Sequence, residues 1–175
     1  SMLPNCGIVQ MCGFAGKDKY LKFILSILRE NSRDANNLRQ AMRQVVMYPW
    51  KDIRSIVILH EGHAVGKWVQ QLQREGKQVY EIVIPDKKDI CWLTEMPKKH
   101  VREAIQARHY DLLIDLTQRS SITMQYMAMY IKAGLKTGRN IGKNIYDLSI
   151  DTPAKESPDY LYEQIVKYIQ MFTRG

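Results

Sequence analysis

The sequence predicts an α/β fold, a Rossmann-like three-layer sandwich with a mainly parallel sheet of about five strands and two extra N-terminal helices. Residues 110–116 form a nearly continuous apolar run between polar neighbours, which is typical of a strand buried on both faces of a parallel sheet. From residue 55 onward, short apolar runs also alternate with helical patterns, as repeated strand–helix–strand units require.

The alternating pattern assigns each element of this α/β part. An apolar run at 55–59 predicts the first strand, and apolar residues at helical spacing from Val65 to Leu72 predict the helix after it, which Gly76 ends. The elements expected next are a strand at 78–84, a helix from Pro97, the central strand at 110–116, a helix from Ser120 or Ser121 to about Ala133 that Gly134 ends, a short strand at 135–138, a last strand at 146–150 and a helix that Ser157-Pro158 opens. Side chains expected in the core include Ile90, Trp92 and Leu93 before Pro97, and Leu161, Ile165, Tyr168, Ile169 and Phe172 in the last helix.

The chain divides into an N-terminal helical arm, residues 1–52, and a Rossmann-like α/β domain, residues 53–175. Apolar residues at spacings of three and four predict one helix from about Lys19 and a second from Ala35 to Val46. Pro49 disfavours helix at the residue before it, so the arm ends there. The apolar stripes of these helices must pack on the core or on another subunit, which makes a homodimer through the arm an expectation.

Composition predicts a cytoplasmic globular chain. Hydrophobic residues make up 45% of the 175 residues, and no apolar run approaches the roughly eighteen residues of a membrane span. No N-terminal segment has the charged and apolar regions of a signal peptide. Three cysteines without CxxC spacing argue against a disulfide framework and a structural zinc site, so reduced thiols are expected.

Positive charge is concentrated near the N-terminus. The net charge of the whole chain is +8. Residues 1–54 hold nine basic and four acidic residues and so contribute +5 of this charge. Such asymmetry is compatible with an arm, residues 17–46, that contacts a protein partner, nucleic acid or an acidic membrane surface. The alternative is an ordinary solvated helix face.

A ligand of an open parallel sheet binds beyond the carboxyl ends of the strands, where the strand order reverses. Three loops qualify, at 60–64, 117–121 and 139–144. At the first loop, HExxH spacing is absent, so a polar loop is favoured over a metal site, and residues 62–67 lack the spacing and the Ser or Thr of a Walker loop. No GxGxxG follows the first strand, and the sequence identifies neither a cofactor nor a catalytic residue.

The loop at 117–121 is the strongest candidate for an anion site. Hydroxyls and free N–H groups at a helix N-terminus favour an anion, and Arg119 and Arg139 add guanidinium groups. The alternative is that Ser120 or Ser121 only caps the helix. Asp115, at the end of the central strand, is a candidate base or ribose contact, or an acceptor of loop N–H bonds. The predicted ligand-binding residues are His60, Glu61, Gly62, His63, Asp115, Thr117, Arg119, Ser120, Ser121, Arg139 and Asn140.

Several segments together resemble a small family of uncharacterised bacterial α/β proteins, a domain of unknown function. The matching segments are 55–59, 89–93 before Pro97, 110–116, 136–139 and 146–148. The resemblance covers residues 53–174 and implies the fold but no activity. Arg119-Ser120 and Gly138-Arg139 are also similar to the N-terminal half of heptosyltransferase-type glycosyltransferases, which implies a half-site that needs a partner.

Three functions follow as hypotheses. The first is a domain that binds a phosphate-bearing small ligand, a nucleotide or sugar nucleotide, at the three loops. The second is an interaction module that uses the basic arm, whose binding should weaken steeply with ionic strength. The third is a glycosyltransferase-like half-domain that acts with a partner.

Overall fold

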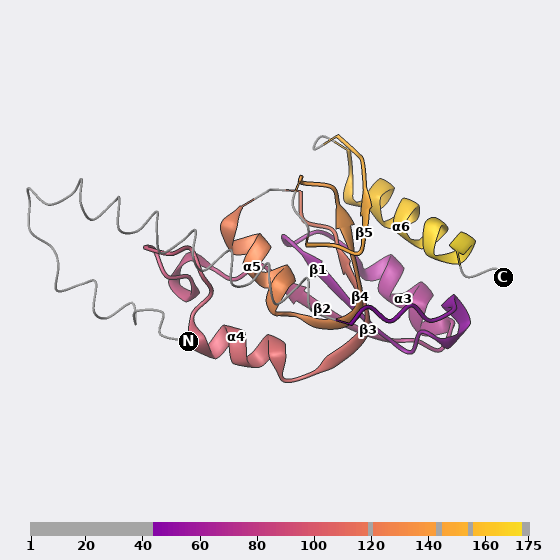
Figure 1. Cartoon of the computed structure of the whole chain (residues 1–175), viewed down its shortest axis with the longest axis horizontal. Coiled ribbons are helices and arrows are strands. Elements are labelled where there is room, and N and C mark those ends of the chain that lie inside the picture. The colour runs from indigo at the N-terminus through magenta and orange to yellow at the C-terminus, as the bar shows by residue number, and fades with distance from the viewer. Residues whose placement is uncertain (1–43, 119–120, 143–144, 154–155, 173–175) are drawn as a thin grey trace, which may run out of the picture.

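The computed structural model describes residues 44–118, 121–142, 145–153 and 156–172 (Figure 1). The two helices predicted in the arm lie largely outside these residues, and so do Arg119 and Ser120. The division into an arm and an α/β domain therefore stays a prediction.

The strands form one five-stranded sheet in the order β2-β1-β3-β4-β5. Every neighbouring pair is parallel, and β3 occupies the centre. This confirms the predicted α/β class and the central place of the 110–116 run. The strands are β1 (Ser55–His60), β2 (Gln78–Val83), β3 (His109–Asp115), β4 (Lys132–Arg139) and β5 (Leu148–Ile150).

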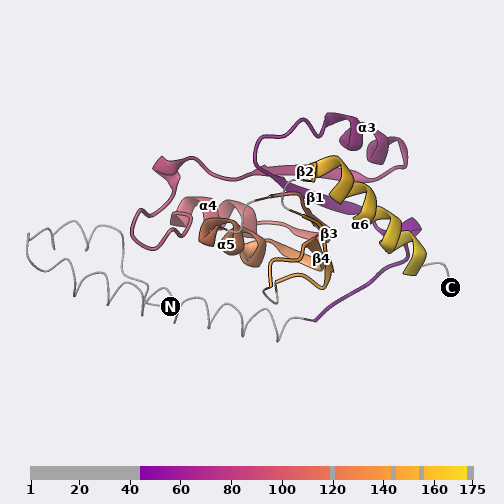
Figure 2. The same ribbon diagram turned by 90° about the horizontal axis from the view of Figure 1, so that it is seen from above.

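Helices cover both faces of the sheet, as Figure 2 shows: α3 and α6 lie on one side, and α4 and α5 lie on the other. Two short 3-10 turns complete the described elements. The helices are α3 (Gly66–Arg74), α4 (Lys99–Gln106), α5 (Ile122–Tyr130) and α6 (Pro158–Phe172), and the turns are η2 (Trp50–Asp52) and η3 (Lys87–Asp89).

β3 separates two apolar cores by the alternation of its side chains. Leu112 and Ile114 pack in the core under α3 and α6, whereas Leu113 packs in the core under α4 and α5. All three are fully buried. Side chains that alternate across a strand with both faces covered explain why the sequence shows a continuous apolar run rather than an alternating pattern.

The boundary between α5 and β4 differs from the prediction. The helix ends at Tyr130, not near Ala133, and β4 already begins at Lys132. Gly134 therefore lies inside a strand. A Cβ there would lie 3.3 Å from the carbonyl oxygens of Asp111 and Val46, so this glycine permits close backbone approach instead of ending a helix.

Other boundaries and burials also differ. Residues 44–49 are irregular, so no helix continues to Val46, whose N–H instead donates to the Gly134 carbonyl at 3.0 Å. The last strand begins at Leu148, because Asp147 makes hydrogen bonds to the Lys136 backbone and Tyr146 leaves the sheet. The aromatic side chains predicted to be buried but found exposed are Trp92, Tyr168 and Phe172. Cys91 takes part in a disulfide bond, so the prediction of reduced thiols is wrong for this cysteine.

The helices within the described ranges include none that is both long and apolar enough to span a membrane.

A glycine and a tyrosine fix the place of the segment before β5. The ring of Tyr146 lies on Gly138 of β4, and a Cβ added at Gly138 would lie 2.6–2.9 Å from three ring atoms. No side chain can occupy this space unless the ring moves.

We predict that Gly138→Ala lowers the free energy of unfolding by about 1–3 kcal/mol, the usual cost of overpacking a buried site. The measurement is urea unfolding followed by circular dichroism. Gly66→Ala is the matched control, because a Cβ at Gly66 has no neighbour within 4 Å, and it should leave stability unchanged or slightly raised. Equal effects of the two substitutions would contradict the proposed packing.

Candidate functional site

Parallel pairing brings the carboxyl ends of β1, β3 and β4 to one edge of the sheet. In the order β2-β1-β3-β4-β5 the direction of winding reverses between β1 and β3, and the crevice beyond these two strands is where open α/β sheets bind ligands. The predicted loops after β1 and β3 flank this point, and the loop after β4 follows one strand farther along.

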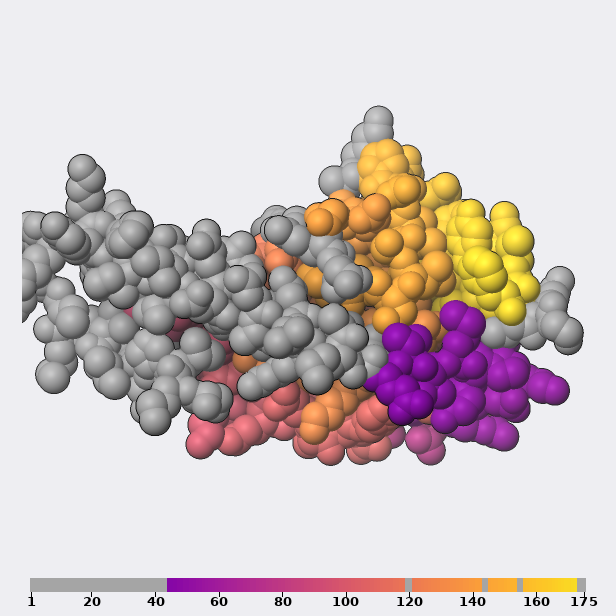
Figure 3. All heavy atoms as spheres, in the orientation of Figure 1, coloured from indigo at the N-terminus to yellow at the C-terminus, as the bar shows by residue number. Residues whose placement is uncertain are grey.

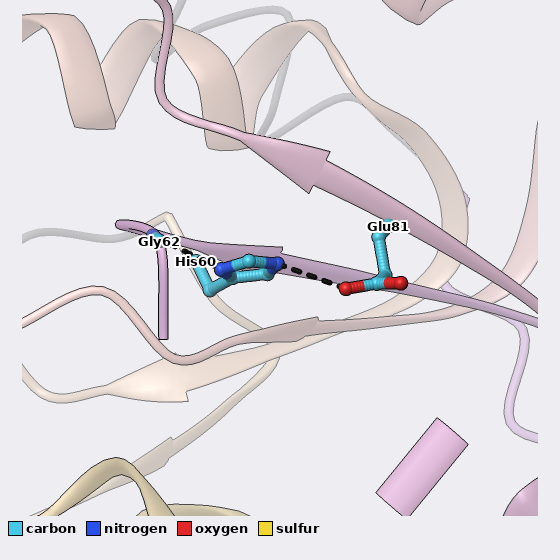
Figure 4. A network of polar contacts seen from close by, with 3 residues as sticks. All are labelled: His60, Gly62 and Glu81. Atoms are coloured by element: carbon cyan, nitrogen blue, oxygen red, sulfur yellow. Dashed lines mark hydrogen bonds and ion pairs between the residues drawn. The ribbon is translucent and has the colours of Figure 1, made fainter. Parts of the chain in front are cut away.

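The imidazole of His60 is buried at the end of β1 and is held from both sides (Figure 4). Its Nδ1 accepts a hydrogen bond from the Gly62 N–H at 3.0 Å, so the ring hydrogen lies on Nε2 and is donated to Glu81 Oε1 at 3.2 Å. Gly62 has φ 98°, a conformation that favours glycine. His60 thus shapes the turn after β1, and both of its nitrogens are engaged within the protein.

The next residues connect the two loops at the switch point. Glu61 Oε2 accepts the backbone N–H of Gln118 at 2.9 Å, which ties the loop after β1 to the loop after β3. The ring of His63 lies 6.4 Å from that of His60, and its Nδ1 is buried without a hydrogen-bond partner. In the described part of the chain, no three His, Cys, Asp or Glu side chains are grouped so that they could hold a metal ion.

Asp115 is a fully buried carboxyl group at the end of β3. Its Oδ1 accepts the Thr117 N–H at 2.9 Å and the Thr117 hydroxyl at 2.6 Å, and its Oδ2 accepts the Tyr146 hydroxyl. Burial raises the pKa of Asp115 to about 6, although the bonds from Thr117 and Tyr146 lower it and Glu61 raises it further. Burial and the neighbouring Asp115 also hold the pKa of Tyr146 well above its usual value.

Arg139, at the end of β4, is also buried, but unlike Asp115 its side chain is not fully hydrogen-bonded. It is only 8% exposed, and its Nε has no hydrogen-bond partner. The ion pairs among the described residues do not include it. Its positive charge lowers the pKa of Tyr146, against the larger upward effects of burial and Asp115. A buried guanidinium without a counter-charge is therefore present at the same edge as the buried Asp115 carboxyl.

Two of the remaining predicted residues, Ser121 and Asn140, have structural roles. Ser121 caps α5, because its Oγ accepts the Met124 N–H at 3.1 Å, as the capping alternative for this loop required. Asn140 accepts the Gly142 N–H at 2.9 Å and donates to Asp151 at 2.7 Å, which joins the loops after β4 and β5. Arg119 and Ser120 lie outside the described residues.

Sequence reasoning missed three residues that complete the site: Glu81, Gln118 and Tyr146. Glu81 and Gln118 carry no local signal, since their partners His60 and Glu61 are far from them along the chain. Tyr146 was assigned to a strand, although Gly138 inside a predicted strand is a sign that a bulky group approaches the backbone.

The chain belongs to the family of unknown function DUF6913, whose model matches residues 68–172. The matched segment contains Asp115, Arg139 and Tyr146, while His60, Glu61 and His63 precede it. Neither the search of curated proteins nor the search of solved structures gave a match.

The raised pKa of Asp115 predicts how stability depends on pH. Between its ordinary pKa of 3.8 and its folded value of about 6, the folded chain binds the proton more tightly than the unfolded chain. The stabilising effect is therefore complete below about pH 4 and is lost as the pH rises through 6. One pKa unit corresponds to about 1.4 kcal/mol, so the loss is about 3 kcal/mol.

We expect Asp115→Asn to remove this loss. Relative to the wild type, the unfolding free energy of the variant should therefore rise by about 3 kcal/mol from pH 4 to pH 7. Tyr146→Phe should move the same transition to higher pH, because it removes a donor to the carboxylate. Urea unfolding at several pH values measures both. A wild-type-minus-variant difference that stays constant over this range would show that Asp115 titrates normally.

Proposed function

We propose that this protein binds a phosphate-bearing small ligand, a nucleotide or sugar nucleotide, at the carboxyl ends of β1, β3 and β4. The observation that supports this most is Arg139, a buried cation whose Nε has no partner. Removing a guanidinium from water without a counter-charge costs several kcal/mol, which an anionic ligand can offset. The planar fork of donors on arginine fits phosphate oxygens well.

The charges at the edge indicate how such a ligand would lie. Glu61 and Asp115 are carboxyl groups, and ionised they would repel a phosphate near the β1–β3 crevice. The phosphate would therefore bind at the β4 end, beside Arg139. β1 and β4 are two strand spacings apart, about 10 Å, which is the scale of a nucleoside. The uncharged part would then extend toward His63, whose Nδ1 lacks a partner.

The wider setting of this proposal comes from the sequence alone. We place the protein in the cytoplasm of a bacterium, and the glycosyltransferase-like half-domain stays a prediction that rests on Gly138-Arg139 and on Arg119-Ser120. The arm-mediated interaction with nucleic acid, a membrane or a protein stays a prediction as well, because most of residues 17–46 lie outside the described residues.

The test is Arg139→Met, which removes the charge and keeps much of the length of the side chain. Inorganic phosphate, ADP and UDP-glucose are compared at constant ionic strength by thermal melting and calorimetry. At least one should raise the melting temperature of the wild type, and Arg139→Met should bind it roughly 10- to 100-fold more weakly, the value of one charged hydrogen-bonded contact. Without ligand, the variant should be as stable as the wild type or more so.

Arg108→Met is the matched control, because Arg108 is an exposed arginine that donates to the Tyr80 hydroxyl before β3 begins. It should leave ligand binding unchanged. Ligand binding that survives in Arg139→Met would mean that the guanidinium does not hold the ligand. A ligand-free Arg139→Met that is clearly destabilised would mean that the guanidinium already has a partner within the protein. Either result removes the basis of the proposal.

A further inference from the structure

A groove of about 320 Å³ lies at the β5 edge of the sheet, on the α6 side, and no residue that lines it is among the predicted ligand-binding residues. Residues 148–151 line one side, and four residues of α6 line the other. Figure 3 shows the surfaces of β5, in orange, and α6, in yellow, next to each other on the viewed face. The groove therefore combines a strand edge and a helix face.

The strand side of the groove presents unused backbone groups. Among the described residues, β5 pairs with β4 alone, which leaves its other edge open. The Asn140 N–H donates to the Ile150 carbonyl at 2.8 Å, so the backbone groups of Ile150 point toward β4. Backbone groups of successive residues point to opposite edges of a strand, so the N–H and C=O of Ser149 point out of the sheet edge.

The helix side presents an aromatic stripe. Tyr160, Gln164, Tyr168 and Phe172 recur at intervals of four residues, so they follow one face of α6. Tyr160 is 43% exposed and Phe172 is 65% exposed, and the rings of Tyr168 and Phe172 stack at 6.4 Å. The neighbouring stripe of α6 is buried in the core. Exposed aromatic residues gathered beside an open strand edge are typical of a protein interface.

We infer that a second copy of this chain covers this groove, with a two-fold axis perpendicular to the sheet beside Ser149. The two β5 strands would pair antiparallel, and Ser149 would exchange two backbone hydrogen bonds with the partner's Ser149. Because this axis keeps both α6 helices on the same face of the joined sheet, the two aromatic stripes would pack against each other. An interface with this symmetry needs a surface that complements itself, and a strand edge beside an apolar helix face would meet that need.

The properties of the groove favour a second copy over a lone peptide. A strand of three residues offers too few backbone bonds to hold an extended peptide by itself. A partner must also cover the α6 stripe, and a second copy brings a strand edge and an apolar helix in the same arrangement. Among the lining residues only Asp151 is charged, and Asn140 donates to it. For a chain of net charge +8, this is a face where two copies repel each other weakly.

This interface differs from the homodimer expected through the N-terminal arm, and one pair of variants separates them. Phe172→Asp places a charge in the aromatic stripe that would pack against the partner's stripe. Trp92→Asp is the matched control, since Trp92 is 64% exposed and lies before α4, away from the groove. Sedimentation equilibrium of the whole chain at physiological salt should show a dimer for the wild type and for Trp92→Asp. Phe172→Asp should dissociate at least tenfold more readily, about 1.4 kcal/mol.

Ser149 gives an independent measurement. Its amide should exchange with deuterium more slowly as protein concentration rises, and Ser149→Pro, which removes the N–H at an open edge, should also weaken the dimer. A wild type that stays monomeric at every concentration overturns the inference. So does a dimer that Phe172→Asp leaves intact, or a Ser149 amide whose exchange does not depend on concentration. Far-UV circular dichroism checks that each variant is folded.

Discussion

All five strands run in the same direction, so their carboxyl ends gather at one edge, and the polar residues there must satisfy one another. β3 is covered on both faces, which leaves the Asp115 carboxyl without water. Its partners come from the residue two positions along and from Tyr146, 31 positions along. The Glu61 carboxylate likewise accepts the Gln118 N–H, which joins the loops after β1 and β3 at the switch point. Direction of pairing and burial therefore decide which loops meet and which side chains hold them.

The same edge carries a buried acidic group at the end of β3 and a buried basic group at the end of β4. At its β3 end, hydroxyl and backbone donors surround the buried Asp115 carboxyl group, and the cost of burial, with a smaller effect of Glu61, holds its pKa above the ordinary value. At its β4 end, the Arg139 side chain is buried almost as deeply, but no ion pair of the described residues compensates it. This difference between a carboxyl group satisfied by the protein and a buried Arg139 Nε without a partner is the basis of our proposal that an external anion binds at this edge.

The sequence predicted what depends on local pattern. The apolar run at 110–116 identified the central strand and its burial on both faces, which the packing of Leu112 and Leu113 in two different cores confirms. Features that depend on tertiary contact were missed. Gly134 was interpreted as a helix end, although the approach of two carbonyl groups requires it within β4. Trp92 and Phe172 fit apolar patterns but are exposed, because periodicity does not show whether a neighbour covers a side chain. Arg139 and Asp115 were identified at the correct edge from topology, whereas Tyr146 was not.

The most direct test of this account is a crystal structure of the chain soaked with inorganic phosphate. We expect a phosphate oxygen within hydrogen-bond distance of the Arg139 Nε, at the carboxyl end of β4, with Asp115 still bonded to Thr117 and Tyr146. An Arg139 Nε that donates to a protein carboxylate or carbonyl, with no anion at this edge in saturating phosphate, would contradict it.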